Sequence, residues 1–274
     1  MKRRKRIQFW RPSRSGFCSM NPNCPLRCKR FTLTGNRSRP EMFEHSAAWY
    51  DALYSFKDYR REAEILRAGI QQRLPQAQTL LDVACGTAAH HPALLESFQV
   101  DGLDLNPVLL ELAAPKNPEG HFFQADMTRF ELKQRYDVIT CLFSSIGYLD
   151  SVHALEQACS HFAQHLKRPG LLAIEPWFTP ETWKPGKVHM LTHEGPDLKI
   201  CRMNRSETLN HQSVLHFHYL VGTELEGVRS FEEIHTLSLF SRQEFQTALE
   251  KAGFQVDYDP EGLTGRGLYW GFLA

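Results

Sequence analysis

The sequence contains no run that approaches the roughly 18 consecutive apolar residues needed for a membrane-spanning helix. Its composition is ordinary for a soluble globular protein, with 42% hydrophobic and 23% charged residues. A chain of 274 residues is long enough to bury a sizeable core as one large α/β domain, with or without an elaboration. We therefore expect a soluble, cytoplasmic protein with no membrane partner.

Acidic residues are missing from the first 40 positions, which contain 12 Lys or Arg. The remainder carries 20 basic and 31 acidic residues, a net charge of −11. Because residues 1–41 lack apolar periodicity and are rich in Pro, Ser and Asn, we predict a flexible basic N-terminal segment there. Three interpretations stay open: a targeting segment, a basic arm attracted to nucleic acid or anionic membrane, and sequence upstream of the working protein. The helix-like stretch MFEHSAAWYD, which begins at Met42, favours the last.

The cysteines lack the spacing of a zinc site, which usually pairs two ligands two to four residues apart and adds a second pair. Three of them follow the pattern C-x5-C-x3-C in the N-terminal segment, at Cys18, Cys24 and Cys28. The other four stand in hydrophobic contexts, typical of small buried residues in a reducing compartment: Cys85, Cys141, Cys159 and Cys201. We therefore predict no metal site.

Strand-like and helix-like segments alternate from residue 79 to residue 178, which predicts a mostly parallel, doubly wound α/β sheet. The run TLLDVA (79–84) is typical of a strand buried on both faces, and a helix from about Pro92 to Phe98 should follow it.

Strand-like pieces then follow one another without helices over residues 186–240, which predicts an antiparallel β elaboration. A last helix over 241–254 has an N-cap at Ser241 and a capping box with Glu244. Two final strands, QVDYD and GLYWGFL, end the chain.

A glycine and two acids stand at the ends of the first three predicted strands, where open α/β sheets bind ligands. Gly86 lets the backbone approach a ligand closely, and Asp104 can accept hydrogen bonds from two ribose hydroxyls. Asp126 can accept from the amine of an adenine while Met127 packs on the ring. Together these positions indicate a cofactor with a nucleoside more strongly than any of them does alone.

The first of these turns lacks the glycines of a dinucleotide-binding loop, because Gly86, Ala88 and His91 stand at the G-x-G-x-x-G positions. NAD is therefore disfavoured. The methyl of Ala88 is harmless if its φ is negative and costs on the order of 1 kcal/mol if its φ is positive. We expect His90 and His91 to form an exposed pair with no third metal ligand.

Several sequence blocks resemble the class I S-adenosylmethionine-dependent methyltransferases. The blocks LLDVACGT, GLDLN and ADMTRF indicate only that class. The blocks FSSIGYL, EPWF and GRGLYWG most resemble the small-molecule N-methyltransferases that dimethylate the amino group of nucleotide-linked (dTDP) deoxyamino sugars. The resemblance runs from about Met42 to the C-terminus.

The resemblance implies a Rossmann-like class I methyltransferase fold over residues 42–274, with an antiparallel last strand and S-adenosyl-L-methionine as the cofactor. Residues 186–240 would form an antiparallel substrate-binding insertion that grips the nucleotide diphosphate. The partner would be a small-molecule amine, and a homodimer is compatible with this interpretation.

The resemblance also implies roles for individual residues. The turn from Ala84 to Ala88 would hold the methionine part of the cofactor, Asp104 the ribose, and Asp126 with Met127 the adenine. The cofactor-binding residues implied are Tyr50, Tyr59, Ala84, Gly86, Asp104, Leu105, Asp126, Met127 and Phe143. The residues implied at the reacting amine are Tyr54, Tyr148 and Arg266. The residues implied to bind the rest of the substrate are Trp177, Arg202, His218 and Arg229.

The implied reaction needs no nucleophilic side chain, because the cofactor carries its own leaving group. The protein must align the amine lone pair with the methyl group and exclude water. A tyrosine, a histidine or a bound water relays the proton of the amine, and we expect this acid–base assistance to be modest.

Two other functions stay open. Another small-molecule N- or O-methyltransferase would share the cofactor contacts and differ over residues 186–240 and at Arg266. A non-catalytic binding partner with this fold would use the basic segment to contact nucleic acid. A nucleic-acid base methyltransferase would usually carry an Asn- or Asp-Pro-Pro-aromatic turn after the fourth strand, where this chain has FSSIG, so no specific nucleic acid is expected.

Overall fold

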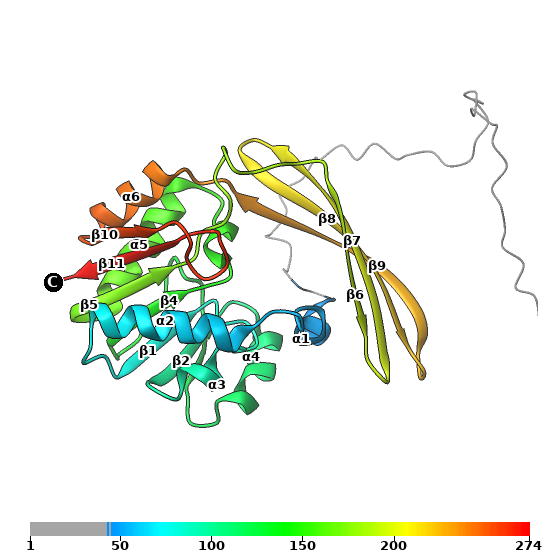
Figure 1. Ribbon diagram of the computed structural model, residues 1–274, viewed down its shortest axis with the longest axis horizontal. Helices are drawn as coiled ribbons and strands as arrows, with labels where there is room; N and C mark the ends of the chain where they lie inside the picture. Colours follow the sequence, from blue (N-terminus) through cyan, green and yellow to red (C-terminus); the bar gives the residue numbers. More distant parts are fainter. Residues whose placement is uncertain (1–42, 44) are drawn as a thin grey trace, which may run out of the picture. The chain divides into compact units, whose positions relative to one another are not determined.

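The computed structural model describes residue 43 and residues 45–274, and the predicted flexible segment 1–41 lies outside these residues. The described residues form two separate β-sheets (Figure 1). The larger has seven strands in the order β10-β11-β5-β4-β1-β2-β3. These strands are β1 (Thr79–Val83), β2 (Gln99–Asp104), β3 (Phe122–Gln124), β4 (Tyr136–Cys141), β5 (Leu166–Ile174), β10 (Gln255–Asp259) and β11 (Leu268–Leu273).

Strands β1 to β5 pair in parallel, whereas β11 pairs antiparallel with both β5 and β10. The predicted Rossmann-like fold with an antiparallel last strand is therefore confirmed. The strand order reverses between β1 and β4, so a crevice opens beyond the carboxyl ends of these two strands.

Helices cover both faces of the larger sheet. Helix α2 buries Ala63, Leu66 and Ile70 against one face, and helices α5 and α6 pack on the other (Figure 1). The helical elements are η1 (Ala47–Trp49), α1 (Tyr50–Leu53), α2 (Tyr59–Arg73), α3 (His91–Leu94), α4 (Pro107–Ala113), η2 (Ala114–Lys116), η3 (Ser145–Tyr148), α5 (Val152–His165) and α6 (Arg242–Lys251).

Local signals predicted the start of α6 correctly and the end of α3 wrongly. The predicted capping box at Ser241 and Glu244 is present at the start of α6. The helix predicted from about Pro92 to Phe98 ends instead at Leu94, so that prediction is wrong in its end. The N–H groups of Ser97 and Phe98 both donate to the Leu94 carbonyl, which closes a turn just before β2 begins.

The smaller sheet consists of four antiparallel strands, which confirms the predicted elaboration. One face buries Ile200, Phe217, Tyr219 and Val221 together with Leu53 of α1. The sheet therefore covers the segment that precedes α2. Its strands are β6 (Val188–Glu194), β7 (Leu198–Leu209), β8 (Gln212–Thr223) and β9 (Gly227–Ser238).

Within the part of the chain that the structure describes, no helix is long and apolar enough to cross a membrane. The same residues contain no cluster of His, Cys, Asp or Glu that could hold a metal ion.

Candidate cofactor and acceptor site

The turn after β1 is built from alternating left-handed residues. Ala84, Gly86 and Ala88 have φ angles of 58°, 55° and 56°. A Cβ added at Gly86 would meet no atom within 4 Å, so the backbone of this residue faces open space. The turn therefore exposes its main chain to a ligand, as the sequence predicted.

The sequence left open whether the methyl of Ala88 is harmless. The φ of Ala88 is positive, so the methyl costs on the order of 1 kcal/mol. We expect Ala88→Gly to raise the free energy of unfolding by up to about 1 kcal/mol, because glycine adopts this conformation without a Cβ clash. Cofactor affinity, measured by calorimetry, should change less than threefold, because the Cα of Ala88 is not part of the pocket lining. A gain in affinity of 100-fold or more would show instead that the natural turn is impaired.

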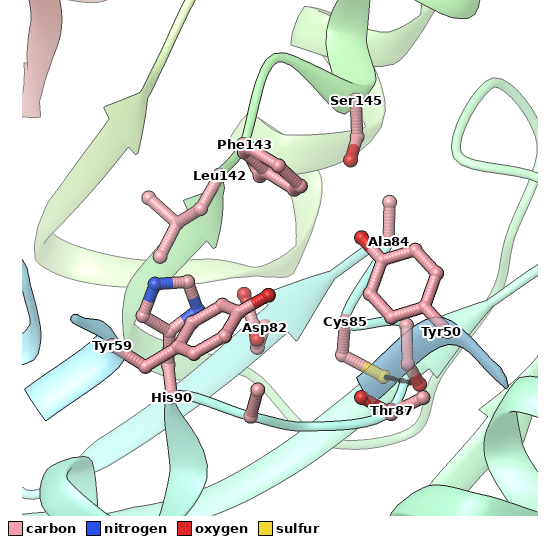
Figure 2. Close-up of a pocket in the computed structure, with 12 residues that line it drawn as sticks. Tyr50, Tyr59, Asp82, Ala84, Cys85, Thr87, His90, Leu142, Phe143 and Ser145 are labelled. Atoms are coloured by element: carbon pink, nitrogen blue, oxygen red, sulfur yellow. Dashed lines mark hydrogen bonds between the residues drawn. The ribbon is translucent and has the colours of Figure 1, made fainter. Parts of the chain in front are cut away.

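A pocket with about 350 Å3 of empty space, part of it open to solvent, lies at the carboxyl ends of β1 and β4 (Figure 2). Its walls come from the turn after β1, the loop after β4 and two tyrosines that begin α1 and α2. The lining residues are Tyr50, Tyr59, Asp82, Ala84, Cys85, Gly86, Thr87, Ala89, His90, Leu142, Phe143 and Ser145. The structure thus gathers five of the predicted cofactor residues, Tyr50, Tyr59, Ala84, Gly86 and Phe143, around one cavity.

Tyr59 offers this pocket an unused hydrogen-bonding group. Its hydroxyl is buried and finds no hydrogen-bond partner among the residues that the structure describes, and Figure 2 shows it pointing into the pocket. Burial, with the nearby Tyr54 and Glu62, raises the pKa of Tyr59 far above its usual range, so the hydroxyl stays neutral and can donate. A buried donor without a partner is costly, so this hydroxyl favours a polar ligand in the pocket.

A buried cluster of Lys57, Glu62 and His90 joins helix α2 to the turn that lines the pocket. His90 Nε2 lies 2.8 Å from Glu62 Oε2, and Lys57 Nζ bonds to the other carboxylate oxygen of Glu62. Burial acts to raise the pKa of Glu62, but the hydrogen bonds from His90 and Lys57 hold it below its usual value. Glu62 is therefore a carboxylate that joins α2, which begins at Tyr59, to the turn. We call Tyr50, Tyr54 and Tyr59 the lid tyrosines.

The expected exposed histidine pair is a wrong prediction, because His90 is 6% exposed and His91 is fully buried. Helix α3 begins here and directs both rings inward: His90 contacts Tyr59 edge-on, and His91 stacks on Phe122.

Asp104 connects the end of β2 to the turn. Its Oδ2 accepts the Gly86 N–H at 2.8 Å, and its Oδ1 accepts the Asn106 N–H at 2.9 Å. Burial raises the pKa of Asp104 although these two bonds act against the rise. A third backbone N–H, that of Leu105, also faces this carboxylate, so of its roughly four lone-pair sites about one stays open to a ribose hydroxyl. The next residue, Leu105, is 43% exposed.

Asp126 and Met127 follow β3, the next strand along the sheet. Asp126 Oδ1 accepts from the backbone and the hydroxyl of Thr128, at 2.9 and 2.8 Å, and Met127 packs partly buried against the core. These two residues, like Asp104 and Leu105, are outside the pocket lining and stand at the neighbouring strand ends. Their predicted contacts with the cofactor stay predictions.

The loop after β4 is strained and held in place by a buried acid. Phe143 and Ser144 have φ angles of 51° and 61°. The fully buried Glu175 accepts the Phe143 N–H at 2.7 Å and the Thr264 hydroxyl at 2.5 Å. Non-glycine residues in this conformation persist where surrounding contacts demand it, which is common at functional sites.

The smaller sheet reaches the lid tyrosines through Arg202. Its Nη1 donates to the Tyr54 hydroxyl at 3.1 Å, and its guanidinium also lies over the Tyr54 ring. The Tyr54 ring lies 4.7 Å from that of Tyr50 and 5.1 Å from that of Phe143. The predicted residues Tyr54 and Arg202 are therefore brought to the pocket side of the sheet.

Arg266 and Trp177 form a second part of the same region. The Arg266 guanidinium donates to the Ser144 hydroxyl at 3.0 Å and lies 5.1 Å from the centre of the Trp177 ring. The two glycines of the GRG motif have φ angles of 80° and 89°, which explains why glycine flanks the arginine on both sides. The Trp177 Nε1–H donates to Ser213 of the smaller sheet at 2.8 Å.

The structure does not bring His218 and Arg229 to this region. His218 alternates with Phe217 and Tyr219 along β8, so it stands on the opposite face of the sheet, 60% exposed and 3.1 Å from Glu232. Arg229 is 56% exposed near the start of β9, where it pairs with Glu226. For these two residues the predicted substrate contact disagrees with their placement, because strand alternation and the hairpin end direct them elsewhere.

Two acids that sequence reasoning missed support the site. Asp51 accepts from the Thr87 hydroxyl at 2.6 Å and from Lys116 at 2.7 Å, which joins α1 to the pocket turn. Glu175 positions the loop after β4. Both stand inside sequence blocks that carry the resemblance, MFEHSAAWYDALY and IEPWF, and this was the signal that could have found them.

Comparisons with known proteins agree with this geometry. A family model described as a methyltransferase domain matches residues 80–170. The chain is 38% identical over 228 residues to dTDP-3-amino-3,6-dideoxy-alpha-D-glucopyranose N,N-dimethyltransferase of Streptomyces fradiae, covering 82% of this chain and 89% of the relative. It is 34% identical to a dTDP-3-amino-3,4,6-trideoxy-alpha-D-glucopyranose N,N-dimethyltransferase of Streptomyces venezuelae. That match covers 82% of this chain and 96% of the relative.

Solved structures are similar over most of their length. The crystal structure of Streptomyces venezuelae DesVI has a TM-score of 0.79 at 34% identity, covering 83% of this chain and 98% of that one. SAM-bound CalS10, an amino pentose methyltransferase from Micromonospora echinaspora, has a TM-score of 0.75 at 31% identity, covering 87% and 100%.

Proposed function

This chain belongs to the family of S-adenosylmethionine-dependent dTDP-amino-sugar N,N-dimethyltransferases, and we propose that it methylates the amino group of a nucleotide-linked amino sugar. The observation that carries the substrate class is the contact between Arg202 of the smaller sheet and Tyr54 beside the pocket. This contact places a cation next to the lid tyrosines, where it can bind a diphosphate or orient the sugar.

The residues around the pocket fit S-adenosylmethionine. The open space above Gly86 admits the methionine part, and the unpartnered Tyr59 hydroxyl can donate to its carboxylate. Asp104 can accept a hydrogen bond from a ribose hydroxyl in addition to its backbone bonds, and Asp126 with Met127 stands one strand further along for the adenine. When bound, the cofactor supplies a methyl group on a sulfonium sulfur that is already activated for transfer.

The acceptor side is proposed to lie between the loop after β4 and the smaller sheet. Tyr54, Tyr148, Trp177, Arg202 and Arg266 are the residues that we propose there. Their role is to hold the amine in line with the methyl group and to exclude water, because alignment supplies much of the rate in a reaction with a preformed leaving group.

Titration of the full-length protein with S-adenosylmethionine, S-adenosylhomocysteine and NAD tests the cofactor. We expect the first two to bind with micromolar affinity and NAD not to bind. Methyl transfer is then assayed on dTDP-linked amino sugars, on the same sugars without the nucleotide and on simple amines or alcohols. Methylation of the simple compounds alone would overturn the proposed substrate class. If neither S-adenosylmethionine nor S-adenosylhomocysteine binds, a non-catalytic protein is favoured.

We expect Tyr54→Phe to lower kcat by less than about 100-fold, because positioning outweighs acid–base catalysis in this reaction. The variant loses the hydroxyl that accepts from Arg202 and keeps the ring that packs on Tyr50 and Phe143. Steady-state kinetics with cofactor calorimetry measure this, and Tyr258→Phe, on β10 against Tyr269, serves as the control. Complete loss of turnover with intact cofactor binding would contradict the expectation.

We propose two further properties. A homodimer is supported by an exposed apolar patch on the outer face of the smaller sheet, whose residues are between 44% and 67% exposed: Val188, Met190, Met203, Leu220 and Ile234. Sedimentation of the full-length protein tests this.

A cytoplasmic location is supported by the four cysteines of the described residues, all of which are free thiols.

A further inference from the structure

A series of three hydrogen-bonded side chains runs from the proposed acceptor site into the smaller sheet. The Tyr148 hydroxyl lies 2.7 Å from His235 Nδ1, and His235 Nε2 lies 3.4 Å from Glu233 Oε2. His235 is 4% exposed and Glu233 8% exposed, so both are shielded from solvent. Tyr148 ends η3, directly after the loop that lines the pocket, whereas the other two residues belong to β9.

At one end of this series, hydrogen bonds from His45 and Ser46 hold the carboxylate of Glu233 in place. Glu233 accepts from the Ser46 N–H at 2.9 Å, the Ser46 hydroxyl at 2.8 Å and the His45 N–H at 3.0 Å. Burial acts to raise the pKa of Glu233, but hydrogen bonds from His235, Ser46 and His45 lower it to about 2. Glu233 is therefore ionised at neutral pH and accepts hydrogen bonds only.

The ionised carboxylate selects one tautomer of His235. A proton on Nε2 can be donated to Glu233, which leaves Nδ1 as the acceptor of the Tyr148 O–H. Burial, together with Tyr54, Tyr219 and Glu233, keeps the pKa of Tyr148 well above its usual range although Arg202 acts against this. The Tyr148 oxygen therefore keeps its proton until a partner takes it.

At the other end of this series, Tyr148 lies near the lid tyrosines. Phe43 packs edge-on against Tyr50, Tyr148 and His235, with ring centres 5.5, 6.3 and 4.8 Å apart. Tyr50 itself lines the pocket. Six charged or titratable groups face Tyr148: Tyr50 of α1, Tyr54 directly after α1, Arg202 of β7, Tyr219 of β8, and His235 and Glu233 of β9. Tyr148 thus stands between the pocket and the smaller sheet.

We propose that Tyr148, His235 and Glu233 form a relay that removes the proton from the substrate amine. This inference rests on the proposed function. The ammonium N–H bond breaks as its proton passes to the Tyr148 oxygen, while the Tyr148 proton passes to His235 Nδ1. The positive charge moves from the substrate to the imidazolium, which Glu233 stabilises, and the amine lone pair is free to attack the methyl carbon. His235 and Glu233 act through Tyr148 and are positioning residues.

His235→Asn separates proton acceptance from structure, because its amide oxygen can still accept from Tyr148 but cannot take a proton at neutral pH. We expect kcat to fall about 10- to 100-fold while KM and cofactor affinity stay within about threefold. In the wild-type protein kcat should decline at acidic pH, where the relay no longer accepts the proton of the amine, and the variant should lose this decline. Tyr148→Phe combined with His235→Asn should be no slower than Tyr148→Phe alone.

The control is His153→Asn, an exposed residue of α5, which should keep the wild-type rate and pH profile. A kcat for His235→Asn within threefold of wild type, with the same pH profile, would overturn the relay. Nitrogen-15 NMR of the histidine rings gives a readout that needs no substrate: His235 should carry its proton on Nε2, and a proton on Nδ1 in the neutral ring also overturns the proposal. If the wild-type protein methylates no amine offered, the proposed function fails, while this tautomer measurement still tests the relay.

Discussion

Asp104→Asn should weaken the binding of S-adenosylmethionine about 100-fold or more. The substitution removes the charge from the acceptor of the ribose hydroxyls, and hydrogen bonds to charged groups contribute roughly 1.5–3 kcal/mol each. It also points an amide NH2 at the N–H of Gly86 or of Asn106, both of which now donate to the carboxylate. If the NH2 faces Gly86, the turn after β1 loses this bond to β2 and keeps only the bond from the Cys85 N–H to the Leu103 carbonyl. Calorimetry with S-adenosylmethionine and S-adenosylhomocysteine measures the effect.

The matched control is Asp197→Asn, an exposed aspartate between β6 and β7, which should leave cofactor affinity unchanged. The wild-type affinity should also depend on pH. Because burial raises the pKa of Asp104, protonation begins at a higher pH than for an ordinary aspartate, so affinity should fall on mild acidification. Asp104→Asn should not show this fall. An affinity within threefold of wild type would mean that Asp104 does not hold the cofactor.

Glu233→Gln should lower the free energy of unfolding at pH 7 by about 3 kcal/mol, which corresponds to a pKa near 2 against an ordinary value near 4.5. The pKa of this carboxyl is depressed in the folded protein, so its stabilisation is present above the unfolded pKa and disappears as the pH falls from about 4.5 to about 2. With roughly 2–4 °C per kcal/mol for a chain of this size, the Tm should drop by about 6–12 °C.

Thermal and urea unfolding across this pH range measure the difference between Glu233→Gln and the wild-type protein. The difference should be largest at neutral pH and should vanish near pH 2. Glu194→Gln, at an exposed glutamate on β6 that pairs with the exposed Lys199, is the control and should unfold like the wild type. Equal stabilities of Glu233→Gln and wild type at pH 7 would show that the hydrogen bonds from Ser46 and His45 do not depend on the charge.

Features that depend on neighbouring residues were predictable from the sequence. The capping box at Ser241 and the buried strand at TLLDVA each follow from a few consecutive residues. The ligand-binding edge followed as well, because parallel strands end on the same side and Gly86 and Asp104 stand at such ends. Backbone detail did not follow: the positive φ of Ala88 comes from the path that the chain takes between β1 and α3.

Placement across the chain was not predictable in the same way. His218 looked like a substrate ligand, yet one residue of alternation along β8 puts it on the outer face while Phe217 and Tyr219 point inward. The relay and its support join distant residues: Tyr148 and His235 are 87 positions apart, and Ser46, which supports the relay, is 187 positions from Glu233. No local pattern signals such pairs.

The sequence alone predicted a mostly parallel, doubly wound α/β sheet, a ligand-binding edge and an antiparallel elaboration, because hydrophobic periodicity, caps and strand-end residues are short-range properties of the chain. The class I methyltransferase fold followed from the resemblance of its sequence blocks. Three features became known from the tertiary structure: the face of the elaboration that meets the pocket, the acids that support the loops, and the histidine and carboxylate behind Tyr148. They depend on strand register and on the contacts of β9 with η3 and with His45 and Ser46, which join residues far apart in the chain.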